Sequence, residues 1–341
     1  MSRRPWLAPT FFAREINIMD ANPETQPSRD ERAAGRKPAG VRTAVILAGG
    51  NGTRLHPITL GVNKHLLPVF DRPMFHYPLS FSLRLGCERI VIVCKDADKD
   101  AMEATLKPYW NPEQATLSFV SQNEPKGLAH ALAQAQPLVG ETPFAVLCGD
   151  NAFLLGAQGT EAATSLAEKF RGKLRGFRSG CHLFLQPCPD PSQVGVATRL
   201  SDAREGSAAP DAVMDGSNRS LDPRDWQETA FGPFKDDPIV KLTEKPKNRT
   251  FGRMAVTGLW LFGPEAFGLI ETLKPSKRQE LEMTDLCRIY MEKGKLTYSM
   301  MGRDVLWRDC GTLRGLQDAS KDTEKMRGIF PNGLIEEAWA S

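Results

Sequence analysis

The 341-residue chain is 25% charged and 41% hydrophobic and has a formal net charge of +3. Its length allows one large domain or two, and the composition is typical of a globular protein with a substantial core. The near balance of charges gives no indication of a nucleic-acid-binding protein. The sequence also has no apolar run of the roughly 20 residues that a membrane-spanning helix needs. We therefore expect no nucleic acid and no membrane among its partners.

The first 40 residues differ from the rest in composition. They are rich in Arg, Pro, Ala, Asp and Glu and carry no uninterrupted apolar stretch of the kind found in a secretory signal. This composition predicts a flexible N-terminal extension over residues 1–40. Met19 is an alternative start of the chain.

The cysteines and histidines show no pattern typical of a metal site. The seven cysteines are odd in number and form no Cys-x-x-Cys pair. Cys94 and Cys148 lie in apolar, strand-like runs, where buried free thiols are common, and free thiols predict a reduced, cytoplasmic protein. The five histidines have neither metal-ligand spacing nor a nucleophile partner. We expect them to be structural or surface residues.

A glycine-rich turn follows the first predicted strand, which covers residues 44–47. Segment 47–55 contains Gly49, Gly50 and Gly52 and is followed by Lys64, ten residues after Arg54. Because glycine lacks a Cβ, the backbone N–H groups of such a turn can approach phosphate oxygens closely. Arg54 can bind two oxygens at once, and Lys64 supplies a point charge. The pattern predicts a triphosphate site after the first strand.

Two common phosphate-binding patterns fit this turn poorly. A dinucleotide-binding turn would have a third glycine where Leu55 stands, and Pro57 prevents a helix from starting cleanly at the turn. The P-loop pattern would place a lysine directly after the last glycine, and this lysine is missing. A dinucleotide site and a plain structural turn remain the alternatives to a triphosphate site.

Helices and strands are expected to alternate over the first half of the chain. Strands in which polar and apolar residues hardly alternate suit a parallel sheet that is covered on both faces. The alternation of these strands with helices indicates a doubly wound α/β fold. Ligands in such folds bind at the carboxyl ends of the strands. The expected elements are a helix at 74–85, a strand at 89–94, a helix at 100–106, a strand at 117–120, a helix at 127–139 and a strand at 144–148.

The second half of the chain contains a region without periodicity. Residues 201–238 are rich in Gly, Asp, Ser and Pro, and we expect a surface loop longer than compact domains usually carry. The elements expected after it are strands at 239–242 and 256–262, a helix at 284–293 and a final strand near 297–301.

Two carboxylates follow predicted strands and precede or follow a glycine. Asp150 comes after strand 144–148, and Asp309 lies just before Gly311. Mg²⁺ is commonly held by one or two carboxylates together with phosphate oxygens, so the pair is a candidate metal site. The alternative for each residue is an aspartate that stabilises a turn.

Two further positions predict contacts with substrate. Glu244 and Lys245 follow strand 239–242 and could bind hydroxyl groups and a second phosphate; the alternative is a solvated ion pair. Gln122 offers an amide that suits the edge of a pyrimidine base, and Gly127 would let the backbone approach that base. The alternative there is an ordinary polar loop.

Several blocks of this chain, taken in order, resemble one enzyme family. The chain is similar to the glucose-1-phosphate thymidylyltransferases, which are sugar-phosphate nucleotidylyltransferases, from about Val41 to Ser320. The resemblance implies a Rossmann-like, doubly wound mixed sheet of the GT-A-like type, with helices on both faces, a nucleotidyltransferase domain over 41–320, an insertion at 201–238 and a short C-terminal tail at 321–341. The blocks are 47–55, 64–69, 72–74, Gln122 with 127–129, 149–151, 244–246, 255–259, 273–276, 280–282 with 284–285, and 307–311.

The resemblance also implies roles for individual residues. The substrates would be dTTP, or UTP, and a sugar 1-phosphate, the product pyrophosphate, the cofactor Mg²⁺ and the assembly a dimer or tetramer. The nucleotide would be bound by Leu47, Gly49, Gly50, Gly52, Thr53, Arg54, Gln122 and Gly127; the sugar phosphate by Asp150, Gly195, Glu244, Lys245 and Gly258; and the metal by Asp150 and Asp309. Arg54, Lys64, Asp150, Lys245 and Asp309 would be catalytic.

The chain departs from the family pattern in several places. Ala152 and the residues after it replace the aromatic, Gly, His and Asp that often follow Asn151, and Arg308 and Cys310 flank Asp309. In the family, the first and last regions contribute to a regulatory nucleotide site, so the short tail predicts weak feedback regulation. UTP use, another hexose 1-phosphate and a catalytically silent regulatory subunit remain alternatives to dTDP-glucose synthesis.

Overall fold

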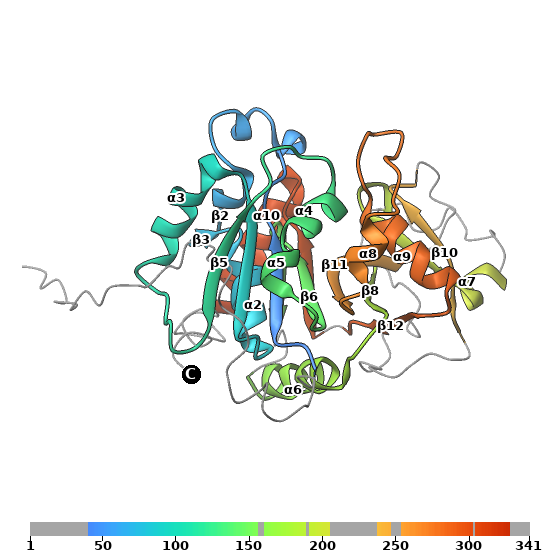
Figure 1. Cartoon of the computed structure of the whole chain (residues 1–341). Helices are drawn as coiled ribbons and strands as arrows, with labels where there is room; N and C mark the ends of the chain where they lie inside the picture. The colour runs from blue at the N-terminus through green and yellow to red at the C-terminus, as the bar shows by residue number, and fades with distance from the viewer. Residues whose placement is uncertain are drawn as a thin grey trace, which may run out of the picture.

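The computed structural model describes residues 40–155, 160–188, 191–204, 237–246, 254–302 and 304–327 (Figure 1). The predicted N-terminal extension lies outside these residues, except for Gly40. Most of the predicted 201–238 loop and the end of the C-terminal tail also lie outside them.

A mixed nine-stranded sheet forms the centre of the described residues. Its first half is parallel: β1 (Thr43–Leu47) lies between β4 (Arg89–Cys94) and β6 (Phe144–Cys148), and β5 (Thr116–Ser121) pairs with β4. β1, β4 and β6 are almost wholly buried, as expected for strands of a sheet covered on both faces, whereas β5 at the edge is only partly buried.

The second half of the sheet is largely antiparallel. β11 (Met254–Phe262) pairs with β6, β8 and β9, and in this way joins the two halves. β8 (Cys181–Pro187) also pairs in parallel with β12 (Leu296–Met300), and β9 (Gly195–Arg199) pairs with β10 (Ile239–Glu244). β11 thus joins the parallel strands to the β9–β10 pair, in which Gly195 lies opposite Glu244.

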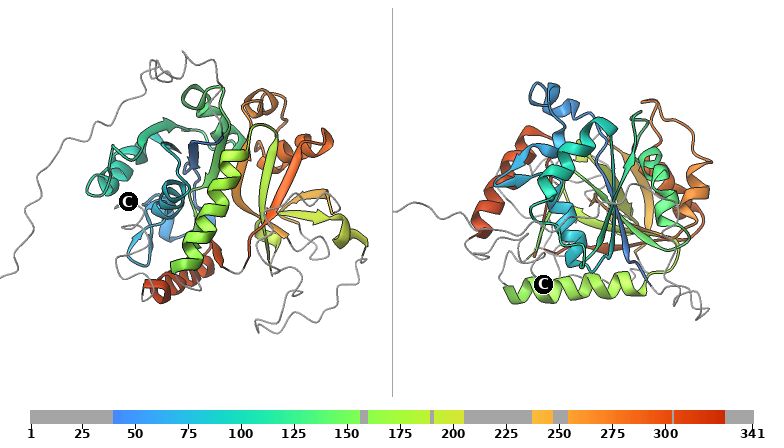
Figure 2. Two further views of the ribbon diagram at one scale, coloured as in Figure 1. Left: turned by 90° about the horizontal axis from the view of Figure 1, so that it is seen from below. Right: turned by 60° about the vertical axis from the view of Figure 1, so that its left-hand side comes forward.

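Alternate side chains of the strands point to opposite faces, and each face has its own core. Ile46 packs in one core, while Val45 and Leu47 pack in the other. Two groups of helices cover these faces (Figure 2), which confirms the predicted α/β fold with helices on both sides. The first core takes α2 (His76–Arg84), α3 (Asp96–Leu106), α6 (Thr160–Gly176) and α10 (Leu313–Arg327); the second takes α4 (Leu128–Gln134), α5 (Gln136–Val139), α8 (Ala266–Ile270) and α9 (Met283–Glu292).

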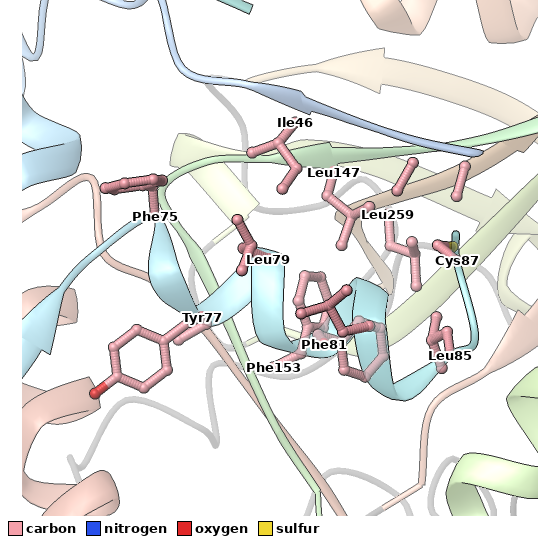
Figure 3. Close-up of a cluster of buried hydrophobic side chains, with 14 of the residues drawn as sticks. Ile46, Phe75, Tyr77, Leu79, Phe81, Leu85, Cys87, Leu147, Phe153 and Leu259 are labelled. Atoms are coloured by element: carbon pink, nitrogen blue, oxygen red, sulfur yellow. The ribbon is translucent and has the colours of Figure 1, made fainter. Parts of the chain in front are cut away.

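An aromatic cluster anchors a small second sheet to the first core. Phe81 of α2 stacks on Phe153 at 4.9 Å between ring centroids (Figure 3). Phe81 also meets Phe170 of α6 edge-on at 5.4 Å. Phe153 belongs to β7 (Asn151–Leu155), which pairs with β13 (Val305–Asp309). Buried aromatic pairs contribute about 0.5–1.5 kcal/mol beyond their area. The aromatic cluster therefore holds β7, the strand that begins next to Asp150, in place.

The structure corrects several predicted boundaries. The helix predicted at 100–106 begins at Asp96, and the helix predicted at 127–139 is divided into α4 and α5, with Pro137 near the start of the second. The predicted 201–238 loop begins with a helical turn, α7 (Leu200–Arg204). The strand near 297–301 is followed by β13, and α10 continues past residue 320.

Several elements of regular structure had not been predicted from the sequence. Among them are β7, β8, β9, α6, α8 and α10. No helix among the described residues is long and apolar enough to cross a lipid bilayer.

One buried histidine predicts how stability depends on pH. The His182 ring is fully buried and lies 2.7 Å from the Thr297 hydroxyl and 2.9 Å from the Ser299 hydroxyl of β12. Burial, followed by the charge of Lys173, lowers its pKa well below the ordinary value. The folded protein therefore keeps this ring neutral under conditions in which the unfolded chain binds a proton.

We expect the free energy of unfolding to fall as the pH drops below about 6.5, with up to about 1.4 kcal/mol per pH unit coming from His182. His182→Gln should be less stable at pH 7 but should lose less stability between pH 7 and pH 5. Urea unfolding at both pH values measures this, with His56→Gln, at an exposed position, as the matched control. Equal losses in wild type and His182→Gln would contradict the assignment.

Candidate active site

The loops that follow the parallel strands meet at one edge of the sheet. Leu47 lies beside Cys148 in the β1–β6 pairing, and Cys94 lies beside Ser121 in the β4–β5 pairing. The segments that leave these strands form the upper end of the molecule in Figure 1. A cavity of about 380 Å³ opens there between the two halves of the sheet. It lies where ligands of doubly wound folds bind.

All the residues predicted for the site line this one cavity. Their roles remain predictions, but the structure brings them together from eight separate segments of the chain. They are Leu47, Gly49, Gly50, Gly52, Thr53, Arg54, Lys64, Gln122, Gly127, Asp150, Gly195, Glu244, Lys245, Gly258 and Asp309.

The glycine loop packs against two of the predicted ligands. Gly52 has φ +66°, in the left-handed region, and a Cβ there would lie 2.9 Å from the Lys64 Cβ. A Cβ on Gly49 would lie 2.7 Å from Gln122 Oε1. A side chain at either position would displace a neighbouring residue or strain the turn. The glycines therefore let the backbone, Lys64 and Gln122 share one small space.

Two cations and two carboxylates form a compact cluster beside this loop. Lys64 Nζ lies 2.5 Å from Asp150 Oδ2, and Arg54 Nη1 lies 3.1 Å from Asp309 Oδ2. Arg54 also reaches Asp150, at 4.0 Å. A Cβ on Gly311 would lie 2.8 Å from an oxygen of Asp309 and 2.9 Å from one of Asp150. Both carboxylates therefore border the same small volume.

Strand pairing holds the two carboxylates together. In the β7–β13 ladder Asp309 lies opposite Asn151, and the backbone N–H of Cys310 donates to the Asp150 carbonyl at 2.8 Å. The Gly311 N–H donates to Asp309 Oδ1 at 2.8 Å, which fixes the side chain. Residues far apart in the sequence thus have a short backbone connection.

The two carboxylates differ in their electrostatic environment. Burial opposes ionisation of Asp150, but Lys64 above all, with Arg54, outweighs it and lowers the pKa of Asp150 below its ordinary value. The pKa of Asp309 is raised, first by burial and then by the charge of Asp150, against the opposing effect of Arg54. The pair carries negative charge that a further cation would stabilise.

The oxygens of this pair fit Mg²⁺ better than a softer metal. The described residues contain no group of three or more His, Cys, Asp or Glu side chains that could hold a metal ion by themselves. Two carboxylates next to a phosphate site supply the hard oxygen ligands that Mg²⁺ prefers. Metals that need several nitrogen or sulfur ligands do not fit this pair.

Asn151 and Trp307 orient Asp150 but had not been predicted to act there. Trp307 Nε1 donates to Asn151 Oδ1 at 2.5 Å, and Asn151 Nδ2 donates to Asp150 Oδ1 at 2.8 Å. Asn151 also lies beneath Gly258, where a Cβ would be 3.1 Å from the amide. Gly258 has φ +70°, which explains the glycine. Within the family block 149–151, the sequence predicted a role for Asp150 alone.

A second cluster of charged and polar side chains surrounds Glu244, at the end of the cavity away from the glycine loop. Thr284 Oγ1 donates to Glu244 Oε2 at 2.5 Å, and Arg278 Nη2 lies 3.2 Å from Glu244 Oε1. Arg278 also pairs with the buried Glu282 at 2.7 Å. Arg278, Glu282 and Thr284 had been given no role from the sequence, because their segment is remote from the predicted strand ends.

Lys245 has an unusual backbone conformation. Its φ is +42°, in the left-handed region, and its N–H donates to the Val194 carbonyl at 3.1 Å. Such a conformation costs a non-glycine residue on the order of 1–3 kcal/mol and is frequent at ligand sites. The Lys245 ammonium lies 3.9 Å from Glu244 Oε1. The strained turn thus brings the cation to the cavity beside Glu244.

Gln122 lies at the end of the cavity opposite Glu244. This side chain is 4% exposed, and its Nε2 donates to the Gly127 carbonyl at 3.2 Å. Segment 126–129 is hydrogen-bonded to Leu281 in both directions: Leu281 N–H donates to Lys126 O at 2.8 Å, and Ala129 N–H donates to Leu281 O at 3.1 Å. Gly127 has φ +104°, and a Cβ there would lie close against this backbone.

A family model for nucleotidyl transferases matches residues 43–199 and 221–326 of the chain. The chain belongs to this family. It is a sugar-phosphate nucleotidylyltransferase, as the sequence motifs predicted, and the predicted resemblance is confirmed.

Several known proteins are similar to this nucleotidyltransferase. A glucose-1-phosphate thymidylyltransferase of Mycolicibacterium smegmatis is 32% identical over 300 residues, which cover 86% of this chain and 88% of that protein. One of Neisseria meningitidis is 30% identical over 285 residues, 84% of this chain and 83% of that protein. The solved structure of a Bacillus anthracis protein assigned as a glucose-1-phosphate thymidylyltransferase, in complex with sucrose, has a TM-score of 0.60 at 29% identity, covering 82% of this chain and 94% of that one.

The fold of this nucleotidyltransferase extends to a more distant structure. A UDP-glucose pyrophosphorylase complexed with UDP-glucose has a TM-score of 0.61 at 22% identity and covers 84% of this chain and 100% of that one. This likeness supports the arrangement of the sheet and helices.

Gly127 allows a direct test of the contact between the two ends of the cavity. Gly127→Ala should lower the free energy of unfolding of the nucleotidyltransferase by about 1–3 kcal/mol, because alanine strains the positive φ and its Cβ meets the Leu281 backbone. Gly86→Ala is the matched control, since Gly86 has φ +80° but open space around it. Urea unfolding should show a larger loss for Gly127→Ala; equal losses would contradict a tight contact with Leu281.

Proposed function

We propose that this nucleotidyltransferase transfers a thymidylyl group from dTTP to glucose 1-phosphate and releases pyrophosphate. The observation that carries the proposal is one cavity that is lined by the paired carboxylates Asp150 and Asp309 and by two separate groups of cations. Arg54 and Lys64 lie at the glycine-loop end, and Lys245 with Arg278 lies at the other. A cavity with two cationic ends suits two anionic substrates.

The glycine-loop end would bind the triphosphate. Backbone N–H groups of 49–53 can approach phosphate oxygens because the glycines leave room. Arg54 and Lys64 now neutralise carboxylates, and both are close enough to the loop to pair with phosphate oxygens instead. Gln122 and Gly127 would then contact the pyrimidine base at the far side of the loop.

The other end would bind the sugar 1-phosphate. Lys245 would pair with its phosphate, and Glu244 would accept hydrogen bonds from sugar hydroxyls, with Gly195 and Gly258 keeping the walls open. A Cβ on Gly195 would lie 3.1 Å from the Thr284 hydroxyl and 3.5 Å from Glu244 Oε2. Space for a sugar ring beside Glu244 therefore depends on that glycine.

Asp150 and Asp309 would hold Mg²⁺, which when bound stabilises negative charge on the transferred phosphoryl group and the leaving pyrophosphate. An oxygen of the sugar phosphate attacks the α-phosphorus, and pyrophosphate leaves in line. Both reactants are anions, so Arg54, Lys64 and Lys245 offset their repulsion and bind the charge that spreads over the phosphoryl oxygens. The chain's own residues position the two substrates and neutralise their charges. No covalent enzyme intermediate is required.

The names of the relatives support thymidine and glucose as the substrates. Both the mycobacterial and the neisserial relatives are glucose-1-phosphate thymidylyltransferases. UTP is the second candidate nucleotide, because an amide such as Gln122 can pair with the N3–H that thymine and uracil share.

Removal of one ionic group from either end should stop the reaction without unfolding the protein. Asp150→Asn and Lys245→Ala are each expected to lower kcat/KM for pyrophosphate release by about 100-fold or more, the usual cost of losing a group that stabilises charge in the transition state. Chelation of divalent cations should have a comparable effect on wild type. Lys293→Ala, an exposed lysine at the end of α9, serves as the control.

A matrix of substrates tests the assignment itself. Each of dTTP, UTP, dCTP and dATP is combined with glucose 1-phosphate or another hexose 1-phosphate, and pyrophosphate release is measured. We expect dTTP with glucose 1-phosphate to give the highest kcat/KM. A higher value for another pair would reassign the substrates, and no release with any pair would favour a silent regulatory subunit.

A further inference from the structure

His130 lies directly behind the amide that faces the base end of the cavity. It is the third residue of α4, and its ring Nδ1 lies 2.9 Å from Gln122 Nε2. His130 does not line the cavity, whereas Gln122 does. The histidine can therefore act on a bound nucleotide only through Gln122.

The backbone determines which way the Gln122 amide points. A carbonyl oxygen can only accept a hydrogen bond, so the 3.2 Å contact with the Gly127 carbonyl requires Nε2, not Oε1, on that side. The second Nε2 hydrogen then points at His130 Nδ1, which must be an unprotonated acceptor. Both hydrogen bonds of the Gln122 side chain within the described part of the chain thus use Nε2. The remaining group, Oε1, lies toward Gly49.

We propose that His130 is a positioning residue that locks the Gln122 amide with its carbonyl oxygen toward the base, and so makes the site selective for pyrimidines that carry an N3–H. This inference rests on the proposed function, since it assumes that a nucleotide base lies against Gln122. It adds a basis for rejecting cytosine, which binding by Gln122 alone does not provide.

The chemistry of the bases explains the selectivity. Thymine and uracil present N3–H, a donor, and Gln122 Oε1 accepts from it. Cytosine presents an unprotonated N3, which is an acceptor, so two acceptors would face each other in a desolvated site. A site built to hydrogen-bond one group rejects an analogue that leaves its polar atom unpaired. If the amide could turn over, Nε2 would donate to cytosine and the discrimination would be lost.

The surroundings of His130 keep it neutral and in place. Gln134 Nε2 donates to the His130 carbonyl at 3.2 Å, and the Ala131 N–H donates to Gly127 O at 3.1 Å, which fixes the first turn of α4. Burial and then Lys126 lower the pKa of His130, against a smaller opposing effect of Glu124. The neutral ring carries one proton, and the hydrogen bond that Gln122 Nε2 donates to Nδ1 places this proton on Nε2.

Two substitutions separate the hydrogen bond from the bulk of the ring. His130→Leu removes the acceptor, whereas His130→Asn places an oxygen close to the position of Nδ1. KM and kcat for dTTP and for dCTP, each with saturating glucose 1-phosphate, are measured for wild type and both variants, together with the melting temperature. The loss of one hydrogen bond corresponds to roughly a threefold to tenfold effect.

For His130→Leu we expect the ratio of kcat/KM for dTTP to that for dCTP to fall threefold to tenfold, through a higher KM for dTTP with little change in kcat. His130→Asn should restore most of that ratio. An unchanged ratio in His130→Leu would overturn the proposal, and so would an equal fall in His130→Asn. If wild type used no pyrimidine nucleotide at all, the proposed function itself would fail, so the two failures are distinguishable.

Discussion

The close approach of two carboxylates, Asp150 and Asp309, is the constraint on which the rest of the site depends. Burial first, and then the like charge of Asp150, raise the pKa of Asp309. The chain offsets this repulsion between like charges by bringing Lys64 to one carboxylate and Arg54 to both. The glycine loop exists in this form because two cations, two anions and a backbone turn must share one small volume.

Such a charged cluster contributes little stability of its own, because desolvation of the ions offsets much of their attraction. The rigidity of the site comes instead from the apolar layers beneath it. Phe153 of β7 stacks on Phe81 of α2, which in turn meets Phe170 of α6, and β7 pairs with β13. The core thus fixes the spacing of Asp150 and Asp309, while Arg54 and Lys64 stabilise their ionised forms.

The elements best predicted from the sequence are those whose residues are apolar throughout, such as β4 and β6, because burial on both faces leaves an uninterrupted signal. The glycine loop, Asp150, Lys245 and Asp309 could be proposed from the sequence because their spacing matched a chemical need or a family pattern. Asn151, Arg278 and His130 were not proposed. Their importance lies in a hydrogen bond or ion pair with a residue distant in the fold or on another segment, and no local pattern encodes such a partner. β7 was missed because its first residue continues a motif that also suits a turn.

The hydrogen bonds between Leu281 and segment 126–129 have a consequence for engineering. The segment that carries Arg278 and Glu282 to one end of the cavity is bonded through its backbone to the helix start that shapes the other end. The two ends of the cavity are therefore not separable modules. A redesign of the proposed nucleotide end that shifts the start of α4 is expected also to move the wall of the proposed sugar end. The two segments should accordingly be exchanged as a unit when specificity is transplanted between relatives.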